Sequence, residues 1–391
     1  MNNIIKVKNK RYWDIENTYK LNCPYNVVVG MRSNGKTYGC KKKGLERYAD
    51  GLGEMAIVRS WAEDFKGNRG KNVFADIVED GVVKELFNDE YNTIEYKAGA
   101  WYLGKIDENS KITLAPEPFA WAFALTGMEH DKSISFPNIT FIVYDEFISR
   151  KSWIPDAFNL FQNVISTIVR ERGSIDDIRI YMLANTVSYF SEFYDEMRIN
   201  PRELKSGQIK IYEHYPNPKL RVALEYCDVV ERSDDETKFF DFGTKKSKMI
   251  TRGEFEIPEY PRYTEEIKPK DIKQYFFIKF KEYILQCEIV KTKYGYIINT
   301  HQKTTPVKYE TDIVYDLNTY ENNPRHIRNI MTDKSIFTLK VLKLIDADKI
   351  YYANNITGEI FRAYIQECIE DMPPCPVPSP AQIKMQEILQ F

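Results

Sequence analysis

The sequence lacks any apolar run near the roughly 20 residues that a membrane-spanning helix needs. Its first residues, MNNIIKVKNKRYW, also lack the apolar core of a signal peptide. The 6 cysteines are scattered without a C-x-x-C pair, which argues against a disulfide framework and against a zinc site. Together these absences predict a soluble cytosolic protein with reduced thiols and no membrane partner.

An excess of one charge is also missing. The formal net charge is −2 at pH 7, so the chain as a whole does not attract nucleic acid, and any nucleic-acid site must be a local patch. Hydrophobic residues make up 43% and aromatic residues 14% of the chain, which is ample for packed cores. A length of 391 residues favours about two or three domains.

The stretch VVVGMRSNGKTYG, residues 27–39, has the G-x-x-x-x-G-K-T spacing of a phosphate-binding loop. A β-branched run precedes it and reads as a buried strand, and a helix is expected to start near Lys36. Lys36 can reach the β- and γ-phosphates, and the Thr37 hydroxyl can bind Mg²⁺. The pattern places these residues around the phosphates: Gly30, Arg32, Ser33, Asn34, Gly35, Lys36 and Thr37.

A second apolar strand, ITFIVYDEF, ends in the adjacent carboxylates Asp145 and Glu146. If this strand lies next to the phosphate-loop strand, Asp145 can hold Mg²⁺ through water and Glu146 can activate the attacking water. Alternatively, the two acids merely start an exposed loop. The two motifs together indicate a nucleotide hydrolase rather than a kinase of small metabolites.

Two polar features downstream, a pair of arginines and an asparagine, allow two interpretations each. Arg170 and Arg172 end a helix with apolar residues at helical spacing. Such arginines complement the helix dipole or, in a ring of subunits, reach the γ-phosphate of the neighbour. Asn185 ends another buried strand, where it senses the γ-phosphate or simply starts a turn.

Strand-like and helical stretches alternate through the first two hundred residues, which predicts an α/β fold with a mostly parallel sheet. Residues 92–114 read as an inserted antiparallel hairpin. We expect a first domain over residues 1–200 and a partly helical connector over 201–264. Antiparallel strands and mixed elements follow over 265–372, and a proline-rich spacer with a short helix ends the chain over 373–391.

Four segments, in order, resemble the DNA-packaging ATPases of phi-twenty-nine-type tailed phages, which are small relatives of the large terminases. They are VVVGMRSNGKTYG, FPNITFIVYDEFI, TIVRERGSIDDIRIYMLANTVS and the tyrosine-rich C-terminal strands. The resemblance is strongest over residues 25–188 and weaker over 273–372. An arginine inside the phosphate loop, Arg32, and the P-N-x-x-x-I-V-x-D-E-F string are its most specific features.

The resemblance implies an additional-strand catalytic-glutamate (ASCE, RecA-like) P-loop ATPase domain that binds ATP and Mg²⁺. Such ATPases form a homopentameric ring at the portal of the viral prohead, in the cytoplasm of the host cell. There, ATP hydrolysis drives double-stranded DNA into the capsid, in some members with the help of a structural RNA.

Residue roles follow from the same resemblance. It implies Lys36 and Thr37 as the Walker A pair, Asp145 as the Walker B acid, Glu146 as the catalytic glutamate and Arg170 as the arginine finger acting on the neighbouring subunit. It also matches Lys132 to a basic residue that acts across the subunit interface, and Arg59 to an arginine of the second strand.

The family's pore-facing lysine has no clear counterpart, because Ala62 stands near its position. A few residues later, KGNRGK supplies Lys66, Arg69 and Lys71 between glycines. A flexible basic loop of this kind can track DNA phosphates without reading sequence. An ordinary solvated hairpin tip is an equally good interpretation.

The C-terminal part resembles a vestigial nuclease domain of the RNase H-like α+β type. Its first strand, YFFIKFKEYILQC, has no aspartate at its centre, whereas a two-metal nuclease needs converging acids there. We therefore expect attachment to portal, DNA or a structural RNA instead of cleavage. Candidate patch residues, if they are not scattered surface charge, are Lys279, Lys281, Lys291, Lys293, Arg325 and Arg328.

Two alternatives to the packaging motor stay open. One is a terminase large subunit with an active nuclease, and the other is a non-motor P-loop nucleotide-binding protein. The acids of YDEF argue against a non-hydrolysing module, and the first C-terminal strand argues against a nuclease.

Overall fold

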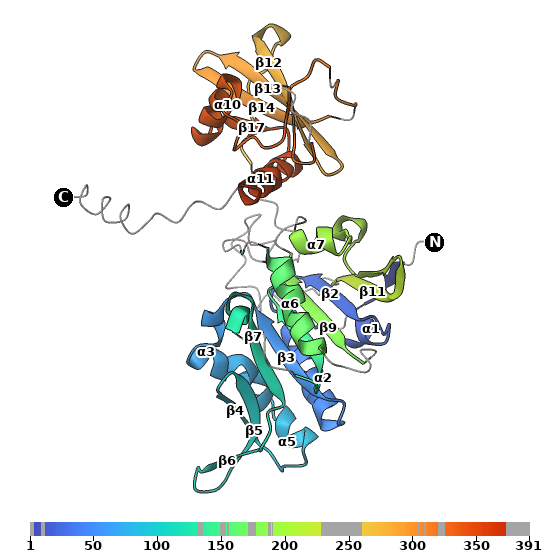
Figure 1. The fold of residues 1–391 in the computed structure, drawn as a ribbon. Helices are drawn as coiled ribbons and strands as arrows, with labels where there is room; N and C mark the ends of the chain where they lie inside the picture. Colours follow the sequence, from blue (N-terminus) through green and yellow to red (C-terminus); the bar gives the residue numbers. More distant parts are fainter. Residues whose placement is uncertain are drawn as a thin grey trace, which may run out of the picture. The chain divides into compact units, whose positions relative to one another are not determined.

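A computed structural model describes residues 4–8, 12–130, 136–148, 154, 156–170, 177–186, 189, 191–227, 260–303, 305–308, 310–319 and 325–372. The chain divides into two compact units, Met1–Glu256 and Ile257–Phe391 (Figure 1). Among the described helices, none is long and apolar enough to span a bilayer.

The first unit is built on one large sheet. Its strands are β1 Ile4–Lys6, β2 Tyr25–Gly30, β3 Glu54–Arg59, β4 Thr93–Lys97, β5 Ala100–Ile106, β6 Ile112–Leu114, β7 Ala120–Ala124, β8 Ile139–Asp145, β9 Arg179–Asn185, β10 Gln208–His214 and β11 Asn217–Tyr226. They lie in the order β1-β10-β11-β2-β9-β8-β3-β7-β5-β4, with β6 beside β5. Neighbours from β11 to β7 are parallel, which confirms the predicted α/β fold.

Helices cover both faces of this sheet (Figure 1). They are α1 Glu16–Tyr19, α2 Lys36–Ala49, α3 Asn68–Lys71, α4 Ala75–Glu79, α5 Val82–Leu86, α6 Ala157–Val169 and α7 Glu192–Glu196. Val27 and Val29 of β2 join the cluster that contains Phe161 of α6, whereas Val28 joins the cluster that contains Leu45 of α2. Burial on both faces explains why the strand reads as a continuous β-branched run.

The strands predicted from YNVVVG, EMAIVRS, ITFIVYDEF and IRIYMLANT are confirmed as β2, β3, β8 and β9. The inserted antiparallel hairpin is confirmed as β4 and β5, and β6 adds a third strand to it.

The predicted connector over residues 201–264 is wrong for its described part. Only the short 3₁₀ turn Pro201–Glu203 is helical there, and β10 and β11 belong to the main sheet. Ile209, Val222 and Leu224 are buried, but charged residues alternate with apolar ones along both strands and make the segment read as polar. Residues 228–259 and the tail 373–391 lie outside the described residues.

The second unit has a six-stranded sheet in the order β16-β15-β12-β13-β14-β17. Its strands are β12 Ile272–Phe280, β13 Tyr283–Thr292, β14 Gly295–Gln302, β15 Val314–Asp316, β16 His326–Ile327 and β17 Ile350–Tyr352. The antiparallel run β12-β13-β14 and its turn at 293–295 confirm the prediction.

Two helices, α10 Ile336–Asp346 and α11 Asn355–Glu370, pack against one face of this second sheet. Phe276 contacts Phe337 of α10, and Phe280 contacts Tyr364 of α11. Both helices begin at a side-chain cap: Ser335 accepts a hydrogen bond from the Thr338 amide, and Asn354 accepts one from the Thr357 amide.

Phe161 anchors α6 to the strand that carries the acid pair, because its ring stacks on Tyr144 at 5.0 Å and it has no exposed surface. We expect Phe161→Ala to lower the free energy of unfolding of the first unit by about 3–5 kcal/mol. Calorimetric melting would measure this change. Ser166→Ala, at an exposed position of the same helix, is the control and should leave the transition within about 0.5 kcal/mol of wild type.

Candidate nucleotide site

The loop between β2 and α2 has the backbone of an anion-binding turn. Ser33 has a φ of 57° and Gly35 a φ of 87°, so two nearly consecutive residues are left-handed. Such a turn gathers backbone N–H groups on one side. Helix α2 begins at Lys36, as predicted, which adds its positive dipole end to the same place. Gly30 is needed for packing, because a Cβ there would lie 2.7 Å from the Cβ of Cys227.

The Lys36 ammonium lies inside this loop. Its Nζ donates to the carbonyl of Gly30 at 3.1 Å, the carbonyl of Met31 at 2.8 Å and Oδ1 of Asn34 at 3.0 Å. Burial lowers the pKa of Lys36, since few waters stabilise the charge. A phosphate beside this amine would therefore gain a strong, poorly screened attraction.

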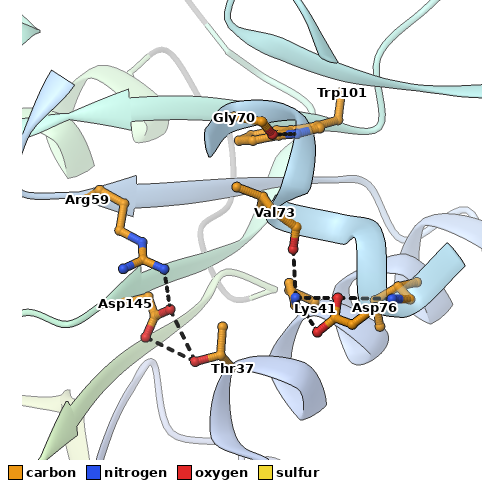
Figure 2. A network of polar contacts seen from close by, with 9 residues as sticks. Thr37, Lys41, Arg59, Gly70, Val73, Asp76, Trp101 and Asp145 are labelled. Carbon is orange, nitrogen blue, oxygen red and sulfur yellow. Dashed lines mark hydrogen bonds and ion pairs between the residues drawn. The ribbon is translucent and has the colours of Figure 1, made fainter. Parts of the chain in front are cut away.

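The two motifs predicted to cooperate meet at Thr37 and Asp145 (Figure 2). The Thr37 hydroxyl lies 3.1 Å from each carboxylate oxygen of Asp145. Arg59 at the end of β3 bridges the acid pair, because Nη2 lies 2.8 Å from Asp145 and Nη1 lies 3.1 Å from Glu146. A hydroxyl beside a carboxylate is a donor set suited to Mg²⁺.

Glu146 differs from Asp145 in exposure and backbone. Its side chain is 64% exposed, whereas that of Asp145 is 8% exposed. Its φ of 58° is a left-handed value that glutamate rarely adopts, and strain of this kind concentrates at functional sites. The turn aims the two neighbouring carboxylates into different surroundings.

The expectation that the acid strand lies directly next to the phosphate-loop strand is wrong, because β9 lies between β2 and β8. The chain returns from β8 through α6 and inserts β9 in this position. Asn185 at the end of β9 pairs with Gly30, while Leu183 pairs with Asp145. Asn185 therefore lies on the strand between the two motifs, where its side chain is partly exposed.

Arg170 directly follows α6 and is exposed. Because β8 and β9 are parallel, α6 must run back to the edge where both strands begin. Phe161 of this helix stacks on Tyr144, and Arg170 follows nine residues later, so about 14 Å of helix separates Arg170 from the level of the acid pair. Arg32 is exposed in the phosphate loop, and Lys132 lies outside the described residues.

The basic segment, residues 66–71, is neither a flexible loop nor a hairpin tip. Residues 68–71 form α3, and the Gly70 carbonyl accepts a buried hydrogen bond of 2.8 Å from Nε1 of Trp101. A Cβ at Gly70 would lie 2.5 Å from the Phe65 carbonyl. Lys66 and Arg69 have exposed side chains beside Glu63 and Asp64, at 3.1 Å and 4.0 Å.

Two contacts near the loop have no local signature in the sequence. Trp13 donates from Nε1 to Oε2 of Glu225 at 2.8 Å, and its amide donates to the Asn34 carbonyl. Burial raises the pKa of Glu225 to about 7. The residues are 212 positions apart, so only the fold brings them together. The other contact joins Lys41 of α2 to Asp76 of α4.

The six basic residues proposed as a patch in the second unit are spread over it. Lys281 pairs with Glu367 of α11, whereas Lys293 pairs with Glu265 near the other end of β13. The ten residues of β13 separate these two turns by about 33 Å. Three further members also have local partners: Lys279 with Asp316, Arg328 with Asp371, and Arg325 with backbone carbonyls of Glu310 and Thr311.

A family model described as "Podovirus DNA encapsidation protein (Gp16)" matches residues 8–347 of the chain. The chain belongs to this family. The Gp16-family relatives include the DNA packaging protein of Bacillus phage phi29, which is 25% identical over 320 residues, or 78% of this chain and 85% of that protein. The DNA packaging protein of Bacillus phage B103 is 25% identical over 237 residues, which cover 59% of this chain and 64% of that protein.

Two solved structures share the fold of this Gp16-family chain. The bacteriophage phi29 viral genome packaging motor assembly has a TM-score of 0.55 at 19% identity, covering 91% of this chain and 100% of that one. The Phi-28 gp11 DNA packaging motor has a TM-score of 0.53 at 17% identity, covering 92% and 99%.

Because its pKa is raised, Glu225 binds a proton more tightly in the folded than in the unfolded protein. Its contribution to stability is present below the usual value of 4.5 and is lost as the pH rises through about 7. We expect the unfolding free energy of wild type to fall over this window, relative to Glu225→Gln, by on the order of 3 kcal/mol. Thermal melting across pH would measure it. Glu213→Gln, at an exposed position of the neighbouring strand, should keep the wild-type profile.

Proposed function

We propose that this Gp16-family protein hydrolyses ATP with Mg²⁺ and uses the energy to drive double-stranded DNA into a viral capsid. The carrying observation is the 3.1 Å contact between Thr37 and Asp145, because it joins the phosphate loop to the acid pair. Family membership and the relatives' name, DNA packaging protein, support the substrate.

In this proposal the loop amides and Lys36 hold the β- and γ-phosphates of ATP. Thr37 and Asp145 would hold Mg²⁺, which when bound would supply positive charge beside the phosphate oxygens. Glu146 orients the attacking water and accepts its proton, and Arg59 positions that carboxylate. Asn185, whose strand position pairs with Gly30, would sense the γ-phosphate.

Arg170 follows the end of α6 that points away from the acid pair, which supports a role toward the neighbouring subunit. We therefore propose an ASCE-type ATPase that works as a ring, a homopentamer by family resemblance. It would dock at the portal of the prohead in the host cytoplasm, with or without a structural RNA. Lys132 would act across the same interface.

For the second unit we propose an RNase H-like fold that serves attachment. The antiparallel run β12-β13-β14 with β15 parallel to β12 agrees with that topology. Nζ of Lys279 lies 3.0 Å from Oδ2 of Asp316, so an ammonium already neutralises this acid, whereas a two-metal nuclease needs acids free to bind cations. This pair favours attachment over an active terminase nuclease.

Mixing two inactive variants tests the ring. We expect Glu146→Gln to lower ATP hydrolysis by about 10²–10⁴-fold and Arg170→Ala by about 10³-fold, with ATP binding retained. Mixed assemblies should regain hydrolysis, because an intact Glu146 of one subunit meets an intact Arg170 of the next. Steady-state ATPase assays on assembled protein would show it. Mixtures no more active than their parents would contradict the role of Arg170 across the interface.

The basic segment should contribute phosphate contacts to DNA. We expect the triple change of Lys66, Arg69 and Lys71 to alanine to weaken DNA binding at every sequence. It should reduce the slope of log affinity against log salt by about one for each DNA phosphate that the variant no longer neutralises. A filter-binding titration over a salt series measures this. The control triple Lys84, Lys97 and Lys111 to alanine makes the same charge change at exposed positions. If both triple variants weaken DNA binding equally, the effect comes from overall charge, and the proposed role of the basic segment is wrong.

A further inference from the structure

The stretch 59–76 contains the basic segment, and its two ends contact the acid pair and the phosphate-loop helix α2 (Figure 2). At its start, Arg59 at the end of β3 contacts Asp145 and Glu146. At its far end, Asp76 and the Val73 carbonyl contact Lys41 of α2.

Lys41 lies one helical turn after Thr37, so the two side chains share a face of α2. The same short helix face therefore meets Asp145 at one turn and the basic segment's far end at the next.

The Lys41 ammonium uses all of its hydrogen-bond donors in this contact. Nζ lies 2.6 Å from the Val73 carbonyl and 2.6 and 2.7 Å from the two carboxylate oxygens of Asp76. An ammonium has three donors, and all three are used. The Lys41 side chain is 7% exposed, so removing one partner would strand a buried charge.

The chain between this contact and the basic residues is stiff. The helical turns Asn68–Lys71, Asn72–Phe74 and Ala75–Glu79 follow one another without a gap. The Trp101 ring packs against Phe74 at 5.3 Å, and its Nε1 holds the Gly70 carbonyl. A displacement of α2 would therefore be carried to the basic segment without being absorbed by a loop.

We propose that the contact of Lys41 with Asp76 and Val73 couples the nucleotide state of the phosphate-loop helix to the position of the basic segment. Lys41 and Asp76 are positioning residues in this scheme, since they touch neither ATP nor DNA. The inference rests on the proposed DNA-translocating function for its purpose, but the contact itself is testable without DNA.

Hydrogen–deuterium exchange of the full chain gives that test. With Mg²⁺ and a slowly hydrolysed ATP analogue, we expect the exchange rates over residues 66–74 in wild type to change by at least about fivefold. In Asp76→Asn and Lys41→Met this change should be absent, while the phosphate loop is still protected by the nucleotide. Asp76→Glu keeps the carboxylate and should keep the response. Lys43→Met removes a different ion pair of the same helix, with Glu16, and should also keep it.

DNA-stimulated hydrolysis supplies the functional readout. Asp76→Asn and Lys41→Met should lower the stimulation by DNA about tenfold and leave the rate without DNA within about twofold. The proposal is overturned if nucleotide leaves residues 66–74 unchanged in wild type. It is also overturned if both variants keep the nucleotide response and only melt earlier, because the contact would then be merely structural. If DNA does not stimulate ATP hydrolysis by wild type, the proposed function is wrong. The exchange experiment would still show whether the Lys41–Asp76 contact couples nucleotide binding to residues 66–74.

Discussion

The contact between the Thr37 hydroxyl and the Asp145 carboxylate is the constraint on which the site depends. It fixes the first turn of α2 against the end of β8, although another strand separates β8 from the phosphate-loop strand. The contact is possible because parallel strands present their carboxyl ends at one edge of the sheet. Burial on both faces of the sheet then holds that edge in place.

Beside this contact, the adjacent acids Asp145 and Glu146 differ in exposure to solvent. Asp145 is nearly buried and shared between Thr37 and Arg59, whereas Glu146 turns outward through a left-handed backbone. Such a backbone costs of order 1–3 kcal/mol and persists only where the surroundings compensate. Here the Phe147 amide compensates directly, because it donates to the Leu183 carbonyl just after the turn. One acid is thereby fixed for a cation while the next keeps access to water.

Local patterns were enough for most of the first unit and for the two halves of the site. The loop spacing, the apolar runs and the helix start at Lys36 each depend on neighbouring residues, and the structure has them as expected. Local patterns did not predict the strand order, the sheet strands after residue 200 or the fixed form of the basic segment. These depend on partners distant in sequence, such as Trp101 for Gly70 and β2 for β11, which no local pattern reports.

The contribution of β11 to the phosphate loop has a practical side. Residues 222–226 of this strand pair with residues 25–29 of β2, and Cys227 just beyond it packs against Gly30. The residue that packs against Gly30 of the phosphate loop, Cys227, is thus almost two hundred positions away in the sequence. A fragment ending at residue 200, the boundary suggested by composition, would expose one whole edge of β2 to unwanted pairing. Truncation for biochemical work should therefore retain the chain through Cys227.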